Sequence, residues 1–142
     1  MPQDLQKYPT MIPVVAIALI DTSRRVLMQR RRADRAHGGL WEFPGGKVEP
    51  GETADAALLR ECEEELGLRI EAGSLQPLTF AALPGERVVL MLYTCRDWAG
   101  EVACLDADEL GWFSGDALES LAMPPLDVPL ARAVKEVLEK TN

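Results

Sequence analysis

The sequence predicts one α/β domain with a mixed sheet, and three observations lead to this fold class. Apolar segments of strand length recur along the 142-residue chain, separated by polar or Gly/Pro turns. Two longer segments carry apolar residues at helical spacing. Strands that flank helices in this way are typical of α/β architecture. The length is that of one ordinary domain, so we expect residues 1–142 to form a single unit.

The predicted strands are short aliphatic runs bounded by turn residues. Asp21-Thr22-Ser23 separates the first two runs, and Pro84-Gly85 separates two later ones. We expect strands at Val14–Ile20, Val26–Gln29, Leu75–Leu83, Val88–Thr94 and Leu110–Phe113.

The first predicted helix occupies residues 54–66, which contain neither Gly nor Pro. Thr53 is a good N-cap, and Gly67 supplies a stop. The apolar residues of this segment share one side at helical spacing: Leu58, Leu59, Cys62 and Leu66.

A second helix is expected near the C-terminal end. Asp127 can cap it, and Pro129 is tolerated in its first turn. Four apolar residues would then face the core: Leu130, Val134, Val137 and Leu138.

Composition excludes several classes of protein. A formal net charge of −8 argues against a broad basic surface for nucleic acid. The sequence has no run of about 20 apolar residues for a membrane span and no signal-peptide layout, so we expect a cytoplasmic protein. Three cysteines without a C-x-x-C pair, and a single histidine, His37, leave little for a disulfide framework or a zinc site. The sequence leaves open whether the protein is a monomer or a homodimer.

Acidic residues crowd the predicted first helix. Glu61, Glu64 and Glu65 are spaced i, i+3 and i+4, so they cluster on one face beside the apolar stripe. Two carboxylates about 5.5 Å apart, partly removed from water, repel by roughly 3 kcal/mol at an effective dielectric constant of about 20. A hard divalent cation removes that repulsion, and oxygen ligands suit Mg²⁺ or Mn²⁺. A solvated acidic face is the alternative interpretation.

The spacing around these glutamates resembles a known motif. The stretch GKVEPGETADAALLRECEEELGL, residues 46–68, resembles the Nudix box, G-x5-E-x7-R-E-U-x-E-E-x-G-U, in which U is a bulky apolar residue. The matching positions are Gly46, Glu52, Arg60, Glu61, Glu64, Glu65, Gly67 and Leu68. Cys62 departs from the pattern at the first U, although cysteine behaves as a small hydrophobe.

The resemblance extends to about 125 residues and is closest to MutT-type Nudix enzymes. Residues 14–32 look like their opening hairpin, 40–47 like the segment that enters the box, and 124–129 like their base-binding segment. Trp98-Ala99-Gly100-Glu101 and Trp112 also stand where these enzymes have them. The resemblance implies the Nudix fold, a mixed β-sheet sandwiched between α-helices (an αβα sandwich).

The resemblance also implies a metal site. Carried over by position, Glu61, Glu64 and Glu65 are ligands of Mg²⁺, for which Mn²⁺ can substitute. The main-chain carbonyl of Gly45 is a further candidate ligand. MutT-type enzymes add an acid six positions before a tryptophan, and Asp106 holds that position relative to Trp112.

The other catalytic roles follow by position. Glu61 is the favoured general base, with Glu52 and Asp106 as alternatives. Arg60 is expected to pair with Glu52 or a neighbouring carboxylate and to orient it.

Arg31 and Lys47 match phosphate contacts of MutT-type enzymes. Phe43 either flanks the base or is an ordinary core residue, and Arg87 is a further candidate for substrate binding. Solvated loop charges are the alternative interpretation for Arg30, Arg32 and Arg35.

Asp127 matches the base-recognising position of MutT-type enzymes. An ionised carboxylate only accepts hydrogen bonds. It can accept two from guanine N1–H and N2–H₂ or one from cytosine N4–H₂, and it fits adenine poorly unless protonated. Asp127 therefore favours a guanine or cytosine nucleotide. Capping of the last helix is the alternative role, and the two can coexist.

The sequence thus predicts a MutT-type nucleoside triphosphate pyrophosphohydrolase, which converts NTP and water to NMP and pyrophosphate. The first substrate expected is 8-oxo-dGTP, and CTP or a 5-substituted dCTP is the alternative. A dinucleoside polyphosphate or nucleotide sugar is a further alternative that no additional segment of the chain supports. A non-catalytic binding module is disfavoured because all the glutamates of the motif are present.

Overall fold

The computed structural model describes residues 7–140, so both ends of the predicted domain 1–142 lie outside the described residues. Two sheets are present, one ordered β4-β1-β6-β5 and the other β3-β2-β7. The strands are β1 (Ile12–Leu19), β2 (Val26–Arg30), β3 (Trp41–Glu42), β4 (Gly45–Lys47), β5 (Gln76–Ala81), β6 (Val88–Cys95) and β7 (Glu109–Phe113). The helices are α1 (Ala54–Leu66), the 3₁₀ turn η2 (Ala72–Ser74), α2 (Gly115–Glu119) and α3 (Asp127–Glu139).

β1 is the centre of the four-stranded sheet. It pairs in parallel with β6 and antiparallel with β4, so this sheet is mixed, as predicted. Successive side chains of a strand point to opposite faces. Val15, Ile17 and Leu19 accordingly enter one core, and the alternate residues from Ala16 to Ile20 enter another.

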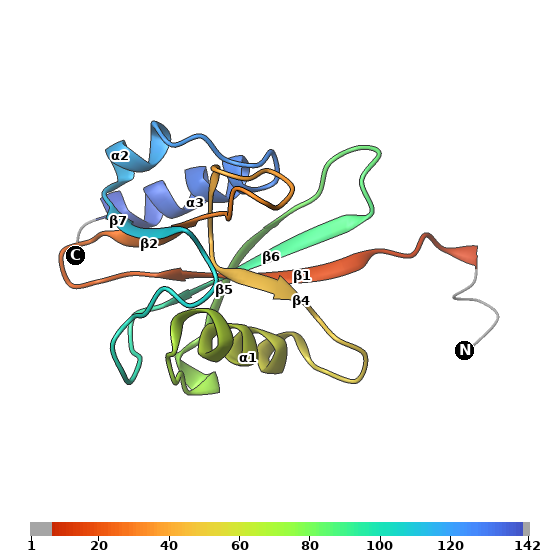
Figure 1. Cartoon of the computed structure of the whole chain (residues 1–142). Helices are drawn as coiled ribbons and strands as arrows, with labels where there is room; N and C mark the ends of the chain where they lie inside the picture. Colours follow the sequence, from red (N-terminus) through yellow and green to blue (C-terminus); the bar gives the residue numbers. More distant parts are fainter. Residues whose placement is uncertain (1–6, 141–142) are drawn as a thin grey trace.

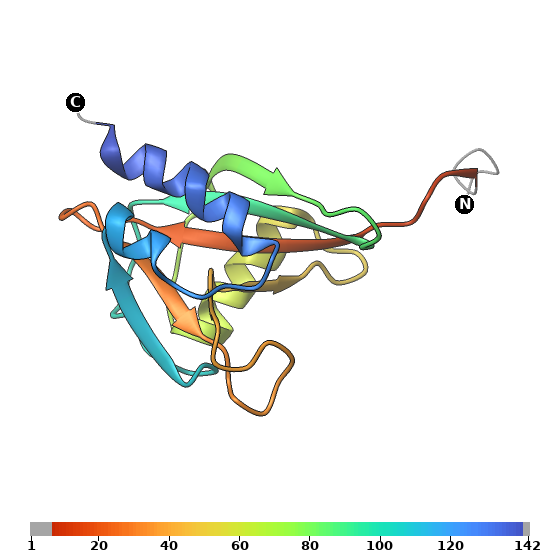
Figure 2. The same cartoon turned by 90° about the horizontal axis from the view of Figure 1, so that it is seen from above.

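Helices cover both faces of this sheet. α1 packs on the face of Val15 and Ile17, and α3 packs on the opposite face (Figure 1). Seen from above, α3 crosses the sheet obliquely (Figure 2). The predicted αβα sandwich is confirmed. Within residues 7–140, none of the helices is long and apolar enough to cross a membrane.

α1 spans the predicted residues because its end signals are local. The side chain of Thr53 accepts a 3.1 Å hydrogen bond from Ala56 N–H. Gly67 ends the helix in the left-handed conformation at φ 69°, where glycine carries no Cβ penalty. Leu58, Cys62 and Leu66 are buried, as their spacing predicts.

The structure corrects the prediction of one sheet. Pairing between the β1 and β2 segments is confined to the turn, with the bridge of Ile20 to Val26 and a 3.0 Å bond from Asp21 N–H to the Arg25 carbonyl, and β2 itself pairs with β3 and β7. The predicted hairpin therefore opens into two sheets. β3, β4 and α2 were not predicted, because these segments are too short to show a period.

The prediction that Asp127 caps α3 is wrong. Leu126 holds the N-cap position without a side-chain cap, and Asp127 is the first helical residue. Asp127 is buried, and its side chain faces another segment of the chain. The predicted core residues of α3 are confirmed, with Leu130, Val134 and Leu138 buried and Val137 packed against them.

Candidate active site

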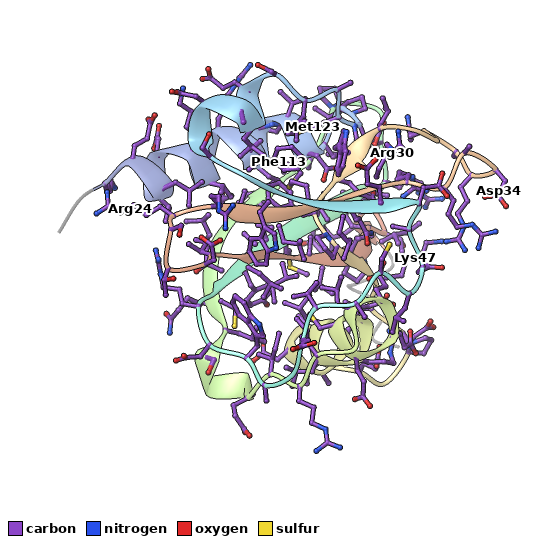
Figure 3. The ribbon with its side chains drawn as sticks, turned by 60° about the vertical axis from the view of Figure 1, so that its left-hand side comes forward. Arg24, Arg30, Asp34, Lys47, Phe113 and Met123 are labelled. Carbon is purple, nitrogen blue, oxygen red and sulfur yellow. The ribbon has the colours of Figure 1, made fainter. Side chains whose placement is uncertain are left out.

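A cavity of about 330 Å³ opens where α1 meets β4, the loop after β2 and the loop before β7. Its cations are Arg31, Arg32, Arg35 and Lys47, and its acids are Glu42, Glu61, Glu65 and Asp106. Both Lys47 and the loop that carries Asp34 lie at one end of the molecule, whereas Arg24 lies at the other (Figure 3). The cavity therefore combines groups that bind phosphate with groups that bind a cation.

Glu65 is the buried acid of this cavity, with 7% of its surface exposed. One carboxylate oxygen accepts a 3.2 Å hydrogen bond from Gln29 Nε2, and the other has no partner among the described residues. Burial raises the pKa of Glu65 above its ordinary value, the Gln29 bond opposes this, and the charge of Glu61 adds to it. A cation beside the free oxygen would favour the ionised form.

Arg60 organises the other glutamates of α1. Its guanidinium binds both oxygens of Glu52, at 2.8 and 2.9 Å. It also donates to Glu61 at 2.8 Å and to Glu64 at 3.3 Å. The guanidinium holds the pKa of Glu52 down at about 2, so this carboxylate stays ionised.

The predicted metal ligands are only partly brought together. Glu61, Glu65, Gly45 and Asp106 line the cavity, whereas the side chain of Glu64 is 60% exposed and turned to Arg60. In the part of the chain that the structure describes, no three acidic, histidine or cysteine side chains converge on one point as metal ligands would.

Two glycines of β4 form the wall of the cavity beside Glu61. A Cβ on Gly46 would lie 2.5 Å from the carboxylate of Glu61. A Cβ on Gly45 would overlap the main-chain carbonyl of Val15 on β1. The close approach of β4 to both α1 and β1 therefore depends on the absence of side chains here.

The three arginines of the cavity are already paired with acids, Arg32 with Asp34 at 2.9 Å. Arg31 donates to Glu42 at 2.9 Å and to the carbonyl of Ala36 at 2.7 Å. Arg35 binds both oxygens of Asp106 at 3.2 and 3.3 Å, which joins the two loops that flank the cavity. Lys47 is exposed.

Asp127 lies at a second cavity of about 150 Å³, together with His37 and Glu86. Its Oδ2 accepts a 3.1 Å hydrogen bond from the main-chain N–H of Phe43. Burial raises the pKa of Asp127 to about 7, although the Phe43 bond lowers it. The remaining walls are mostly apolar, with Val14, Val88, Leu90 and Pro124 among them.

Two predicted substrate contacts lie elsewhere. Phe43 contributes to neither cavity wall. Its side chain is an ordinary core residue, which was the alternative to a place beside the base. Arg87 is exposed, its carbonyl accepts from Ile12 N–H, and it lines neither cavity.

Sequence reasoning missed two residues of the main cavity, Gln29 and Glu42, whereas Arg32 and Arg35, for which solvated loop charges were the alternative, both line it. Gln29 carried a signal, because it is a polar residue directly after the apolar run Val26-Leu27-Met28 of a predicted strand. A polar side chain that is buried needs partners, which it finds in Glu42 and Glu65.

A protein-family model, described as the NUDIX domain, matches residues 10–137. The chain belongs to the Nudix family. Its Nudix box runs from β4 through α1, with Glu61 and Glu65 at the cavity and Arg60 between the other glutamates.

Curated Nudix relatives cover most of this chain. The chain is 35% identical over 123 residues to the CTP pyrophosphohydrolase of Escherichia coli. The aligned region covers 87% of this chain and 90% of the relative. It is 29% identical over 124 residues to the 8-oxo-dGTP diphosphatase of Escherichia coli. The aligned region covers 87% of this chain and 96% of that relative.

Solved structures show the same fold. The Escherichia coli ORF135 protein superposes with a TM-score of 0.77 at 31% identity, over 92% of this chain and 93% of that one. A structure from a study of MutT of Aliivibrio salmonicida and Vibrio cholerae gives a TM-score of 0.79 at 25% identity. The superposition covers 90% of this chain and 99% of that one. These neighbours agree with the sandwich of sheet and helices described above.

Proposed function

We propose that this Nudix chain, 1–142, acts as one domain that hydrolyses nucleoside triphosphates to the monophosphate and pyrophosphate with a divalent cation. One observation carries the proposal. Glu65 holds a buried carboxylate oxygen that has no partner within residues 7–140, in the cavity that Glu61, Arg31 and Lys47 also line. A carboxylate in this position is satisfied by a cation, and the basic residues beside it suit the phosphates of the same substrate.

The cavity fits Mg²⁺, or Mn²⁺ in its place, because all its acidic donors are oxygens. We assign Glu61, Glu64, Glu65 and the Gly45 carbonyl as ligands, with Asp106 as a further one. Glu64 contacts Arg60 through Oε2, so Oε1 is the oxygen that it would offer to the cation. The bound cation would neutralise charge that develops on the phosphate oxygens and would activate the attacking water.

The protein groups supply binding and proton transfer. Arg31 and Lys47 hold phosphate oxygens. Glu61 accepts the proton of the water that attacks phosphorus as the bond to the pyrophosphate leaving group breaks. Both oxygens of Glu52 are occupied by Arg60, and Oε1 also accepts from Glu49 N–H, so Glu52 is assigned to orient Arg60 rather than to take a proton.

The second cavity is proposed to select the base through Asp127. Its free oxygen accepts from guanine or cytosine donors when ionised. The pKa near 7 makes this form available at and above neutral pH. The substrate proposed first is 8-oxo-dGTP, because the relative at 29% identity is named 8-oxo-dGTP diphosphatase. CTP or a 5-substituted dCTP is the second candidate, since the 35% relative is named CTP pyrophosphohydrolase.

The test is kcat/KM over a panel of nucleoside triphosphates that includes 8-oxo-dGTP and CTP, with the phosphate products identified. We expect pyrophosphate as the product, loss of turnover with EDTA and its return with Mg²⁺. Glu65→Gln should lower kcat by orders of magnitude. Release of inorganic phosphate instead, or full turnover after verified metal removal, overturns the proposal.

Asp127→Asn tests the choice of base separately. Asparagine keeps an acceptor for Phe43 N–H but turns the second acceptor into a donor. The ranking of nucleotides should change if Asp127 contacts the base. An unchanged ranking would leave Asp127 a purely structural residue.

A further inference from the structure

Gln29 is a polar side chain in an otherwise apolar part of β2, and only 4% of its surface is exposed. Its Nε2 atom donates to Glu42 at 3.1 Å and to Glu65 at 3.2 Å. Both amide hydrogens are therefore used on carboxylates that line the main cavity.

The amide oxygen of Gln29 has no hydrogen-bond partner within residues 7–140. Oε1 of Gln29 is buried and accepts no hydrogen bond among the described residues, like Oε2 of Glu65. An unpaired buried acceptor costs about 1–3 kcal/mol. Turning the amide over does not help, because Oε1 would then face two carboxylates and their donor would be lost. Both acceptors belong to residues that line the same cavity, where a cation and its bound water can supply their missing partners.

On the basis of the proposed function, in which this cavity binds a divalent cation, we propose that Gln29 is a positioning residue of that metal site. Its Nε2 fixes the orientation of Glu65 and Glu42, and its Oε1 offers a neutral oxygen to the cation and its water shell. A neutral ligand adds affinity without a further negative charge beside Glu61 and Glu65.

A purely structural role makes a different prediction. A buried polar network is often replaced by apolar residues of similar volume with little loss of stability. If Gln29 served packing alone, an apolar residue of the same length would change stability but leave metal affinity as it was. Metal affinity in the absence of nucleotide therefore separates the two roles.

The first experiment titrates purified metal-free protein with Mn²⁺ and follows free Mn²⁺ by electron paramagnetic resonance. Gln29→Met keeps length and volume and removes both polar atoms. We expect its Mn²⁺ dissociation constant to rise about 10–100-fold, as for residues that orient metal ligands. Met28→Ala is the control. Met28 is the neighbour of Gln29 on β2 but packs in the core on the α3 side, so this substitution removes packing and no polar contact to the cavity. Its Mn²⁺ affinity should match that of the unaltered protein.

Gln29→Glu gives a second readout that does not depend on Gln29→Met folding well. It places a third carboxylate against Glu42 and Glu65, so the metal-free protein should melt at a lower temperature. Saturating Mn²⁺ should then raise Tm by more than in the unaltered protein, because binding relieves the repulsion. An equal rise in Tm for both proteins contradicts the inference.

Mn²⁺ binding by the unaltered protein distinguishes failure of the proposed function from failure of the role assigned to Gln29. If the unaltered protein binds no Mn²⁺ and turns over without metal, the proposed function fails. If it binds Mn²⁺ and Gln29→Met binds equally tightly, the proposed function stands and Gln29 is not part of the site.

Discussion

Oδ2 of Asp127 accepts a 3.1 Å hydrogen bond from the main-chain N–H of Phe43, across 84 positions of sequence. This bond ties the first turn of α3 to the chain two residues before Gly45. The segment 43–45 therefore links the two cavities, because Phe43 N–H binds Asp127 of the cavity proposed for the base and Gly45 lines the cavity proposed for the cation. A change at Asp127 acts on stability as well as on substrate binding.

Asp127→Asn should gain stability relative to the unaltered protein as pH rises. Burial raises the folded-state pKa of Asp127 from 3.8 to about 7. The folded state therefore binds a proton that the unfolded state has lost, so stability falls between about pH 4 and pH 7. The full difference corresponds to roughly 4 kcal/mol above pH 7. Asparagine does not titrate and escapes this loss.

Thermal melting of both proteins across about pH 5 to pH 8 measures the effect. The Tm of Asp127→Asn minus that of the unaltered protein should increase with pH and level off above about pH 7. Groups common to both proteins cancel in this difference. A difference that is constant across the range would show that Asp127 titrates normally in the folded protein.

Gly46→Ala and Gly45→Ala should separate activity from stability. The new Cβ at position 46 meets the end of the flexible Glu61 side chain at 2.5 Å, so the carboxylate moves and kcat falls. The new Cβ at position 45 meets the backbone of Val15, which cannot move without disturbing β1.

We expect Gly46→Ala to lose at least about 10² in kcat with a small change in Tm, since a displacement of about 1 Å has this effect. Gly45→Ala should lower Tm by several degrees. Melting curves and kcat for the two variants form the comparison. Retention of normal kcat by Gly46→Ala would mean that the position of Glu61 is not critical.

Arg60→Lys should lower activity while the charge is kept. Lysine cannot form the two-atom bond that Arg60 makes with Glu52, nor hold Glu61 at the same time. Substitution of a residue that orients metal ligands lowers activity about 10–100-fold. Steady-state kcat gives the result, with Arg69→Lys on the exposed loop after α1 as the matched control.

The partnership of Arg60 with Glu52 adds a second requirement. Because the two residues act as one unit, Glu52→Gln combined with Arg60→Lys should cost little more than Arg60→Lys alone. Losses that multiply in the double variant would assign Glu52 an independent role.

Arg35→Ala should weaken substrate binding without destabilising the fold. Arg35 and Asp106 are 49% and 37% exposed, and an exposed pair contributes about 0–1 kcal/mol to stability. Arg35 lines the main cavity and can exchange Asp106 for a substrate phosphate. A charge-assisted contact of about 1.5 kcal/mol predicts a rise in KM of roughly tenfold.

The control is Arg24→Asn at the opposite end of the molecule (Figure 3). It also removes one positive charge, and asparagine tolerates the φ of 58° at this position. KM should rise in Arg35→Ala and stay unchanged in Arg24→Asn. Equal changes in both would indicate a general effect of net charge, and no change in either would leave Arg35 a solvated loop residue.

The sequence by itself determined α1, the Nudix box and the apolar stripe of Leu58, Cys62 and Leu66. The signals for these features are local, since a cap, a stop and a helical period each act within a few residues. The long strands were predicted for the same reason, to within a few residues at each end. The expected pairing of Arg60 with Glu52 or a neighbouring carboxylate came with the resemblance to the Nudix box, and Arg60 binds Glu52 in the structure.

Only the tertiary structure decided which polar residues are buried. Glu64 and Glu65 are neighbours in sequence, but Glu65 lies against Gln29 of β2 while Glu64 remains at the surface. Helix capping was the alternative role that the sequence offered for Asp127, but its side chain binds the main chain of Phe43 instead. Burial and long-range hydrogen bonds depend on what packs against a residue, and chain segments far apart in sequence supply those partners.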